Sequence, residues 1–159
     1  MNTRIPETAQ DMTQETVEGL QDLSYALRDS ISYHREAIEA VDDDYVKSAF
    51  LEIATEREKI VETIGGFVTL AEETPVKDGT WMGSLRSIWT SFRAALNAGD
   101  PTVVLIEAER AEDVIVHKFK DVLPMIAGNP INDHLLKFFE TVKSGHDRVL
   151  ALRNTYQNA

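Results

Sequence analysis

Apolar residues recur at alternating spacings of three and four along five stretches of this chain, the spacing of one face of an α-helix. Four of the predicted helices are long, over residues 13–41, 45–73, 101–126 and 131–156, and one is short, over 81–97. The short helix falls between the second and third long ones. No stretch alternates apolar and polar residues as a β-strand would, so the sequence predicts an all-α protein.

The order of these helices predicts a four-helix bundle with one crossover connection. The turn residues at 74–79 and the short helix together separate the second and third long helices, and a connection of this length lets those two helices run parallel. Residues 1–12 are polar and are predicted to be a flexible N-terminal lead-in. Residues 13–157 are predicted to form a single domain.

Local signals mark most helix ends. Asp11 or Thr13 is predicted to cap the first helix, and the run 42–44 of three aspartates to end it and cap the second. The segment 97–101, Asn-Ala-Gly-Asp-Pro, ends the short helix and starts the next. Gly65–Gly66 weakens the second helix, and close approach of another backbone is one reason for a glycine pair there.

Charge and composition narrow the classes of partner. The 159 residues carry a formal net charge of -11 and include no cysteine. The negative charge disfavours nucleic acid and anionic membranes, because both would be repelled. The lack of cysteine excludes disulfides and thiolate metal sites. No apolar run reaches membrane-spanning length and no signal-peptide core is present, so we expect a cytoplasmic protein.

Each long helix carries one polar residue where its apolar face calls for a hydrophobic one. These residues are His34, Arg57, Glu112 and His146, in chain order. Each lies near the middle of its helix, so the four are predicted to share one layer as a polar core network. Because a buried charge needs a partner, Arg57 and Glu112 are predicted to form an ion pair within it.

This layer has more than one interpretation. His34, Glu112 and His146, together with Glu109 or Glu56, are ligand types that iron, manganese or zinc accept, which suggests a metal site. The layer could instead be a structural network that fixes helix register, or the helix phases could be misjudged. Arg57 favours the structural interpretation, because its permanent cation would occupy Glu112 and repel a metal ion.

Other candidate residues carry weaker signals. Trp81 and Trp89 give the short helix an aromatic face that could bind a protein partner, although packing against the bundle is the simpler explanation. His117 and His134 fall outside the apolar faces and are predicted to be surface residues. No glycine-rich phosphate loop and no serine nucleophile motif occurs, so the sequence does not favour an enzyme.

Short motifs occur in a defined order along the chain. They are Leu20-Gln21-Asp22-Leu23 with Asp29 and Tyr33, Ala54-Thr55-Glu56-Arg57, the segment 83–89, the segment 107–113, and His146-Asp147-Arg148 with Leu152-Arg153. In order and spacing they resemble a bacterial family of unknown function placed in the ferritin-like superfamily. The resemblance spans nearly the whole chain. It implies a ferritin-like bundle and brings no established function.

The chain departs from the metal-binding members of that superfamily, in which two helices each carry a Glu-x-x-His motif. Neither the second nor the last long helix has this motif; Lys143, for example, stands three residues before His146. Glu109 and Glu112, also three apart, are the nearest fragment of it. A full di-iron centre is therefore not expected, whereas a single-metal or vestigial site stays an alternative.

Two hypotheses of function follow. The first is a non-enzymatic ferritin-like bundle protein that acts through self-assembly or partner binding, in a stress or storage context that rests on superfamily analogy alone. The second is a metal-binding or redox protein with a degenerate ferritin-like site in the bundle core. In either case we expect a homodimer formed through an exposed helix face.

Overall fold

The computed structural model describes residues 13–71 and 84–158, without the side chains of residues 84–87 and 89. Its elements are α2 (Gln14–Ala40), α3 (Asp44–Leu70), α4 (Ser84–Ala98), α5 (Pro101–Val122), the 3-10 helix η1 (Leu123–Ile126) and α6 (Ile131–Gln157). No strand occurs in the described ranges, and the predicted all-α class is confirmed. The predicted lead-in over residues 1–12 lies outside them.

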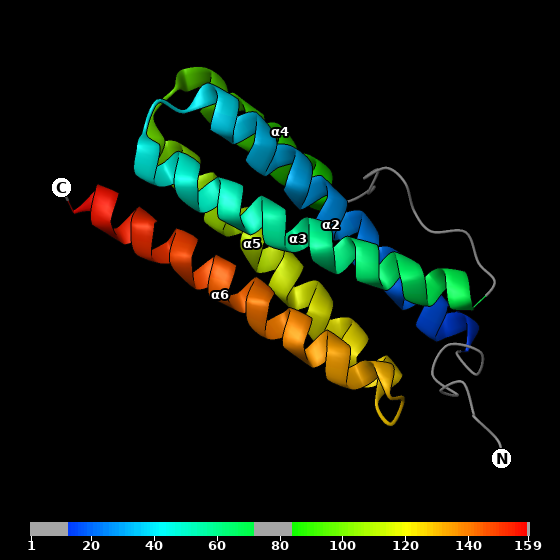
Figure 1. The fold of residues 1–159 in the computed structure, drawn as a ribbon. Coiled ribbons are helices and arrows are strands. Elements are labelled where there is room, and N and C mark those ends of the chain that lie inside the picture. Colours follow the sequence, from blue (N-terminus) through cyan, green and yellow to red (C-terminus); the bar gives the residue numbers. More distant parts are fainter. Residues whose placement is uncertain (1–12, 72–83, 159) are drawn as a thin grey trace, which may run out of the picture.

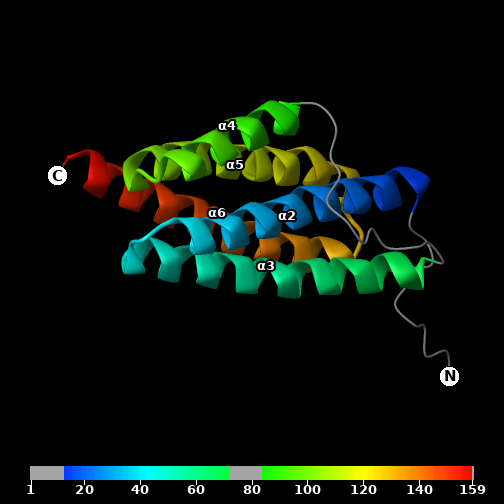
Figure 2. The same cartoon turned by 90° about the horizontal axis from the view of Figure 1, so that it is seen from above.

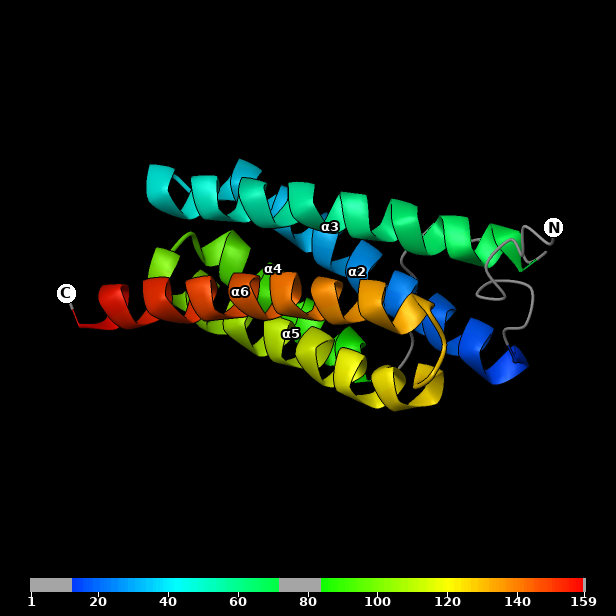
Figure 3. The ribbon, with the colours of Figure 1, turned by 60° about the horizontal axis from the view of Figure 1, so that its bottom comes forward.

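The four long helices lie side by side around a common interior (Figure 1). α2 packs against α3 and α5, and α6 packs against the same two helices from the other side. α3 and α5 run in one direction, while α2 and α6 run in the opposite one (Figures 2 and 3). This is the arrangement that a long connection between α3 and α5 permits.

The short helix α4 lies along the outside of α2 and α5 (Figure 2). Its Phe92 is fully buried and meets the ring of Tyr33 on α2, with 4.9 Å between the ring centroids. Because α4 covers this side of α2, the buried face of α2 is wider than its apolar residues alone predict. Trp81 and the side chain of Trp89 lie outside the described residues. Within the described helices, none is long and apolar enough to cross a bilayer.

Side-chain caps fix where three helices begin. Thr13 accepts a hydrogen bond from the backbone N–H of Thr16, and Asp43 accepts from the first turn of α3. Asp100 accepts from the N–H of Thr102 at 2.9 Å, directly before the proline that opens α5. These caps agree with the predicted helix starts, since each satisfies an N–H that lacks a partner within its helix.

The third long helix ends earlier than its apolar pattern indicates. α5 stops at Val122, and the next four residues form the 3-10 helix η1, with Pro124 in its first turn. A proline has no N–H to donate and crowds the preceding turn, so the α-helical hydrogen bonding cannot continue through it. The prediction that one α-helix continues to Ile126 is therefore wrong in its last turn.

The buried apolar side chains form two clusters, one towards each end of the long helices. The first cluster gathers Leu27, Ile60, Ile115 and Val142, among others, and the second gathers Tyr33, Ile53, Ala111 and Val149, among others. Along each long helix, a short segment separates the residues of one cluster from those of the other. Of the polar residues predicted for the core, Arg57, Glu112 and His146 lie in that segment of their helices.

Two glycines differ in what their positions require. Gly99 ends α4 with a φ of +74°, a left-handed conformation that a side chain disfavours. Gly66 lies within α3, and a Cβ atom built there meets no atom within 4 Å. Close approach of another backbone, one possible reason for the glycine pair, therefore does not apply at Gly66, where the glycine only weakens the helix.

Alanine substitutions should separate these two cases. Gly66→Ala should raise the free energy of unfolding by about 0.5–1 kcal/mol, because alanine loses less conformational freedom in a helix. Gly99→Ala should lower it by about 1–2 kcal/mol, because its Cβ strains the left-handed backbone. Urea unfolding followed by circular dichroism measures both. A destabilising effect of Gly66→Ala would contradict the open space around that residue.

Candidate functional site

A buried ion pair joins α3 and α5 between the two apolar clusters. The Arg57 side chain is 1% exposed and that of Glu112 is 0% exposed. Nη1 of Arg57 donates to Oε1 of Glu112 at 2.7 Å, and Nη2 donates to Oε2. The two parallel hydrogen bonds hold both planar groups in one orientation. The pairing expected from the sequence is thus present.

α2 supplies the remaining polar groups of this network. The hydroxyl of Tyr33 donates to Oε1 of Glu112 at 2.8 Å, and the hydroxyl of Ser30 accepts from Arg57. Nδ1 of His34 lies 2.8 Å from the backbone carbonyl of Ser30. A carbonyl can only accept, so Nδ1 carries the proton. Nε2 of His34 lies 3.2 Å from Oε1 of Glu112 but does not meet hydrogen-bond geometry.

The network keeps Glu112 ionised despite its burial. Burial opposes the charged form, but the cation of Arg57, which also donates two hydrogen bonds to the carboxylate, outweighs it and holds the pKa of Glu112 far below its ordinary 4.5. Burial likewise opposes the charge of Arg57, and the Glu112 carboxylate outweighs it, so the pKa of Arg57 is raised. The core therefore holds one negative and one positive charge that neutralise each other.

The two rings of α2 stay uncharged at neutral pH. Burial lowers the pKa of His34 below 6.5 by more than the nearby Glu112 raises it. Burial and the charge of Glu112 both raise the pKa of Tyr33 well above 10.0. Tyr33 therefore acts as a hydrogen-bond donor, and neither ring adds a charge to the core.

α6 contributes a glycine to this network and no polar side chain. Gly145 is buried, and a Cβ atom there would lie 3.3 Å from Nη2 of Arg57 and 3.4 Å from Cγ1 of Ile53. The glycine lets the backbone of α6 approach the guanidinium closely. His146 follows Gly145 and points about 100° further around the helix, so its side chain leaves the core.

The structure thus brings together three of the four residues predicted for the core network. His34, Arg57 and Glu112 share it, whereas His146 is not among its hydrogen-bonding partners. The four predicted metal ligands are also divided. His34 and Glu112 lie in the core beside a guanidinium, while Glu109 and His146 lie at the boundary of α5 and α6.

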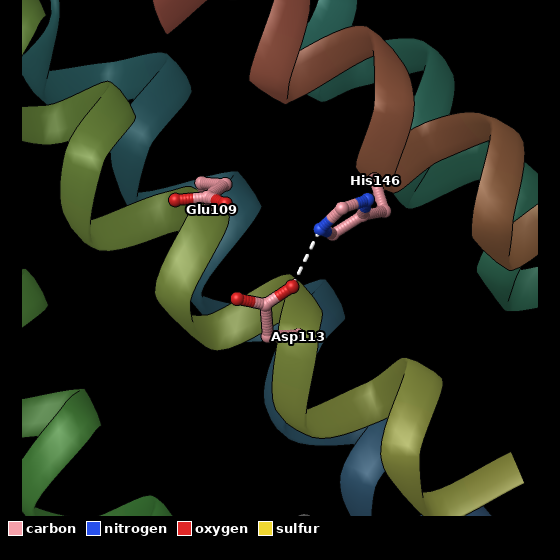
Figure 4. Close-up of side chains that lie close together, drawn as sticks. All are labelled: Glu109, Asp113 and His146. Atoms are coloured by element: carbon pink, nitrogen blue, oxygen red, sulfur yellow. Dashed lines mark hydrogen bonds and ion pairs between the residues drawn. The ribbon is translucent and has the colours of Figure 1, made fainter. Parts of the chain in front are cut away.

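Glu109 and His146 belong to a second cluster of side chains, at the boundary of α5 and α6 (Figure 4). Glu109 and Asp113, one turn apart on α5, face His146 of α6, and one ligand atom from each of the three lies within 4.8 Å of the others. Nε2 of His146 lies 2.6 Å from Oδ1 of Asp113. Its Nδ1 lies 3.1 Å from Oδ1 of Asp147.

The electrostatics of this cluster differ from those of the core. Partial burial lowers the pKa of His146, but hydrogen bonds with Asp147 and Asp113 outweigh it and raise that pKa above 6.5. Oε2 of Glu109 accepts from Nη1 of Arg153 at 2.5 Å. The side chains of Asp113 and His146 are 50% and 15% exposed. The cluster is therefore partly open to solvent.

Sequence reasoning missed Ser30, Tyr33 and Gly145 as members of the core network, and Asp113 as a partner of His146. Ser30 stands one helical turn before His34, which is a signal for a shared face. An isolated glycine within a helix, as at Gly145, often marks a close approach. His117 and His134, which were predicted to be surface residues, are exposed.

A sequence profile of the family described as "Domain of unknown function (DUF2383)" matches residues 15–124, more than half of the chain. The chain belongs to this family. The expectation of a family of unknown function is thereby confirmed. No curated protein and no solved structure is significantly similar to the chain. The residues that match the family include every side chain of the core network but end before α6, so Gly145 and His146 lie beyond them.

Removing one charge of the core pair should destabilise the fold strongly. Glu112→Gln leaves the Arg57 cation buried without a counter-charge, and we expect a loss of about 3–5 kcal/mol in the free energy of unfolding. The double variant Arg57→Met/Glu112→Gln should regain much of this loss, because no unpaired charge remains. Urea unfolding of both single variants and the double variant gives the coupling. Additive losses would contradict the pairing.

The same pair should make the fold sensitive to acid. The folded-state pKa of Glu112 lies below its ordinary 4.5, so its stabilisation is present above that pH and is lost as the pH falls towards the folded-state value. The Glu112→Gln variant lacks this contribution. Its free energy of unfolding should therefore fall less steeply with acidification than that of the wild type. Equal slopes for the two proteins would mean that Glu112 does not contribute.

Proposed function

We propose that this member of the DUF2383 family is a non-enzymatic, ferritin-like four-helix bundle that acts through self-assembly or partner binding. The observation that carries the proposal is the Arg57–Glu112 ion pair at the centre of the fold. In metal-binding bundles, carboxylates at such a position bind metal ions. Here the guanidinium supplies the positive charge that a metal would otherwise bring.

The hydrogen-bond partners of Glu112 support this view. Its Oε1 accepts from Arg57 and Tyr33, and its Oε2 accepts from Arg57. A metal ion bound there would have to displace the guanidinium, which would then be left buried without a counter-charge. That displacement is costly, so the geometry favours the structural role over the alternative of a degenerate metal or redox site in the core.

The directions of the helices support the ferritin-like part of the proposal. In a ferritin-like bundle, one long crossover between the second and third long helices makes those two helices parallel. α3 and α5 run in the same direction here, and α4 stands between them in the sequence (Figure 2). The resemblance of the sequence motifs to a family of that superfamily points the same way.

An apolar depression at one end of the molecule is the surface we assign to self-assembly with a second copy. It has a volume of about 380 Å³ and is lined by Tyr45 of α3 and by Leu152, Thr155 and Tyr156 of α6. Tyr45 is 79% exposed, more than any other large hydrophobic residue described. An exposed aromatic ring beside an apolar depression suits a two-fold contact, in which each ring fills the partner's depression.

If the Arg57–Glu112 pair is structural, no metal ion should bind in the core. The double variant Asp113→Asn/His146→Gln lacks the surface cluster but retains the core network. Because Arg57 fills the core, this variant should bind no Fe(II), Mn(II) or Zn(II) near one ion per chain. Anaerobic equilibrium dialysis followed by elemental analysis measures this. A stoichiometric ion that persists in the variant would support the core metal site instead.

The assembly proposal predicts the effect of a charge in the depression. Tyr45→Glu should convert a dimer to a monomer, because a buried carboxylate without a partner opposes association. Glutamate in the first turn of α3 suits the helix dipole, so the fold itself should persist. Light scattering coupled to size exclusion gives the mass.

A matched control introduces a charge at the other end of the same helix. Leu70→Lys lies in the last turn of α3, where a cation suits the helix dipole and the leucine is 57% exposed. This variant should keep the wild-type mass. A wild-type protein that stays monomeric at the highest concentration attainable would contradict self-assembly, whereas a dimer unaffected by Tyr45→Glu would place the interface elsewhere.

A further inference from the structure

We propose that Glu109, Asp113 and His146 form a binding site for a divalent zinc ion at the boundary of α5 and α6. This site is separate from the core pair and does not depend on the function proposed above. Its three side chains come from two helices and already place one ligand atom each within 4.8 Å of the others (Figure 4). A single ion could therefore contact all three with small side-chain movements.

The helices hold the ligands in place. Glu109 and Asp113 are four residues apart on α5, so both project from one face of that helix. His146 projects from α6 towards them because Gly145, the residue before it, is the one that faces the core. The register that fits glycine against Arg57 therefore also directs the imidazole of His146 towards the two carboxylates.

The orientation of the imidazole suits a metal ligand. Nδ1 of His146 lies 3.1 Å from Oδ1 of Asp147, and Nε2 points to Asp113. Metal-binding histidines commonly donate one ring N–H to a carboxylate, which fixes the tautomer and leaves the other nitrogen to bind the ion. Asp147 is placed for that role. It is a positioning residue and not a ligand.

The donor set favours zinc over magnesium and calcium. One imidazole and two carboxylates, with a solvent molecule as fourth ligand, are a tetrahedral zinc set of the open type. Magnesium and calcium prefer oxygen ligands alone. The carboxylates of Asp113 and Asp147 both contact the imidazole of His146, and the carboxylate of Glu109 is paired with Arg153.

Arg153 is the feature that opposes the ion. Its Nη1 donates to Oε2 of Glu109 at 2.5 Å, so it competes with zinc for that carboxylate. The other oxygen of Glu109 is outside this ion pair. Zinc would therefore compete with the guanidinium of Arg153 for Glu109, and removing that guanidinium should strengthen zinc binding.

Calorimetric titration of the full chain with zinc chloride tests the proposal. The wild type should bind one zinc per chain, and Asp113→Asn or His146→Gln should abolish saturable binding. Asp147→Asn should weaken binding about tenfold or more through loss of the positioning hydrogen bond. Arg153→Gln should strengthen it. His117→Gln removes an exposed histidine of α5 and serves as the matched control, with affinity unchanged.

Three results would overturn the proposal. They are no saturable binding by the wild type, stoichiometric binding that survives both ligand substitutions, and binding that is lost in His117→Gln. All the substituted side chains are partly or fully exposed, so circular dichroism should confirm that each variant folds. A failure here leaves the core proposal intact, because that proposal fails only if an ion persists after Asp113 and His146 are replaced.

Discussion

The ion pair between Arg57 and Glu112 is the constraint on which the rest of this fold depends. Two opposite charges with almost no exposure lie between two apolar clusters, and each would be costly to bury without the other. The hydrogen bonds of a guanidinium and a carboxylate are directional, whereas apolar contacts tolerate sliding. The pair therefore fixes how far α3 and α5 can shift along each other, and Tyr33 of α2 is tied to the same carboxylate.

The same pair influences what the protein can do. Arg57 and Glu112 neutralise each other in the core, and the rings of Tyr33 and His34 stay uncharged at neutral pH. The sites proposed for self-assembly and for zinc lie at the surface. Two surface features stand out there, an apolar depression beside Tyr45 and a solvent-accessible cluster around His146. They lie on helices whose positions the core pair stabilises.

Much of this arrangement could be predicted from the sequence. Helix type and most helix ends follow from local rules, because the spacing of apolar residues and caps such as Asp43 and Asp100 act within one or two turns. The pairing of Arg57 with Glu112 was also predictable, because a charge on an apolar face must find an opposite charge. His34 follows from the same argument.

Only the tertiary structure decided the rest. α4 covers the outer side of α2 and so buries Tyr33, a packing that no local pattern of α2 reveals. The choice between Gly145 and His146 for the core is a rotation of α6 by one residue, about 100°. That rotation depends on the room Arg57 needs against the α6 backbone, a distance between helices far apart in sequence. The sequence by itself determined which residues need partners, and the packing of the helices determined which partners they meet.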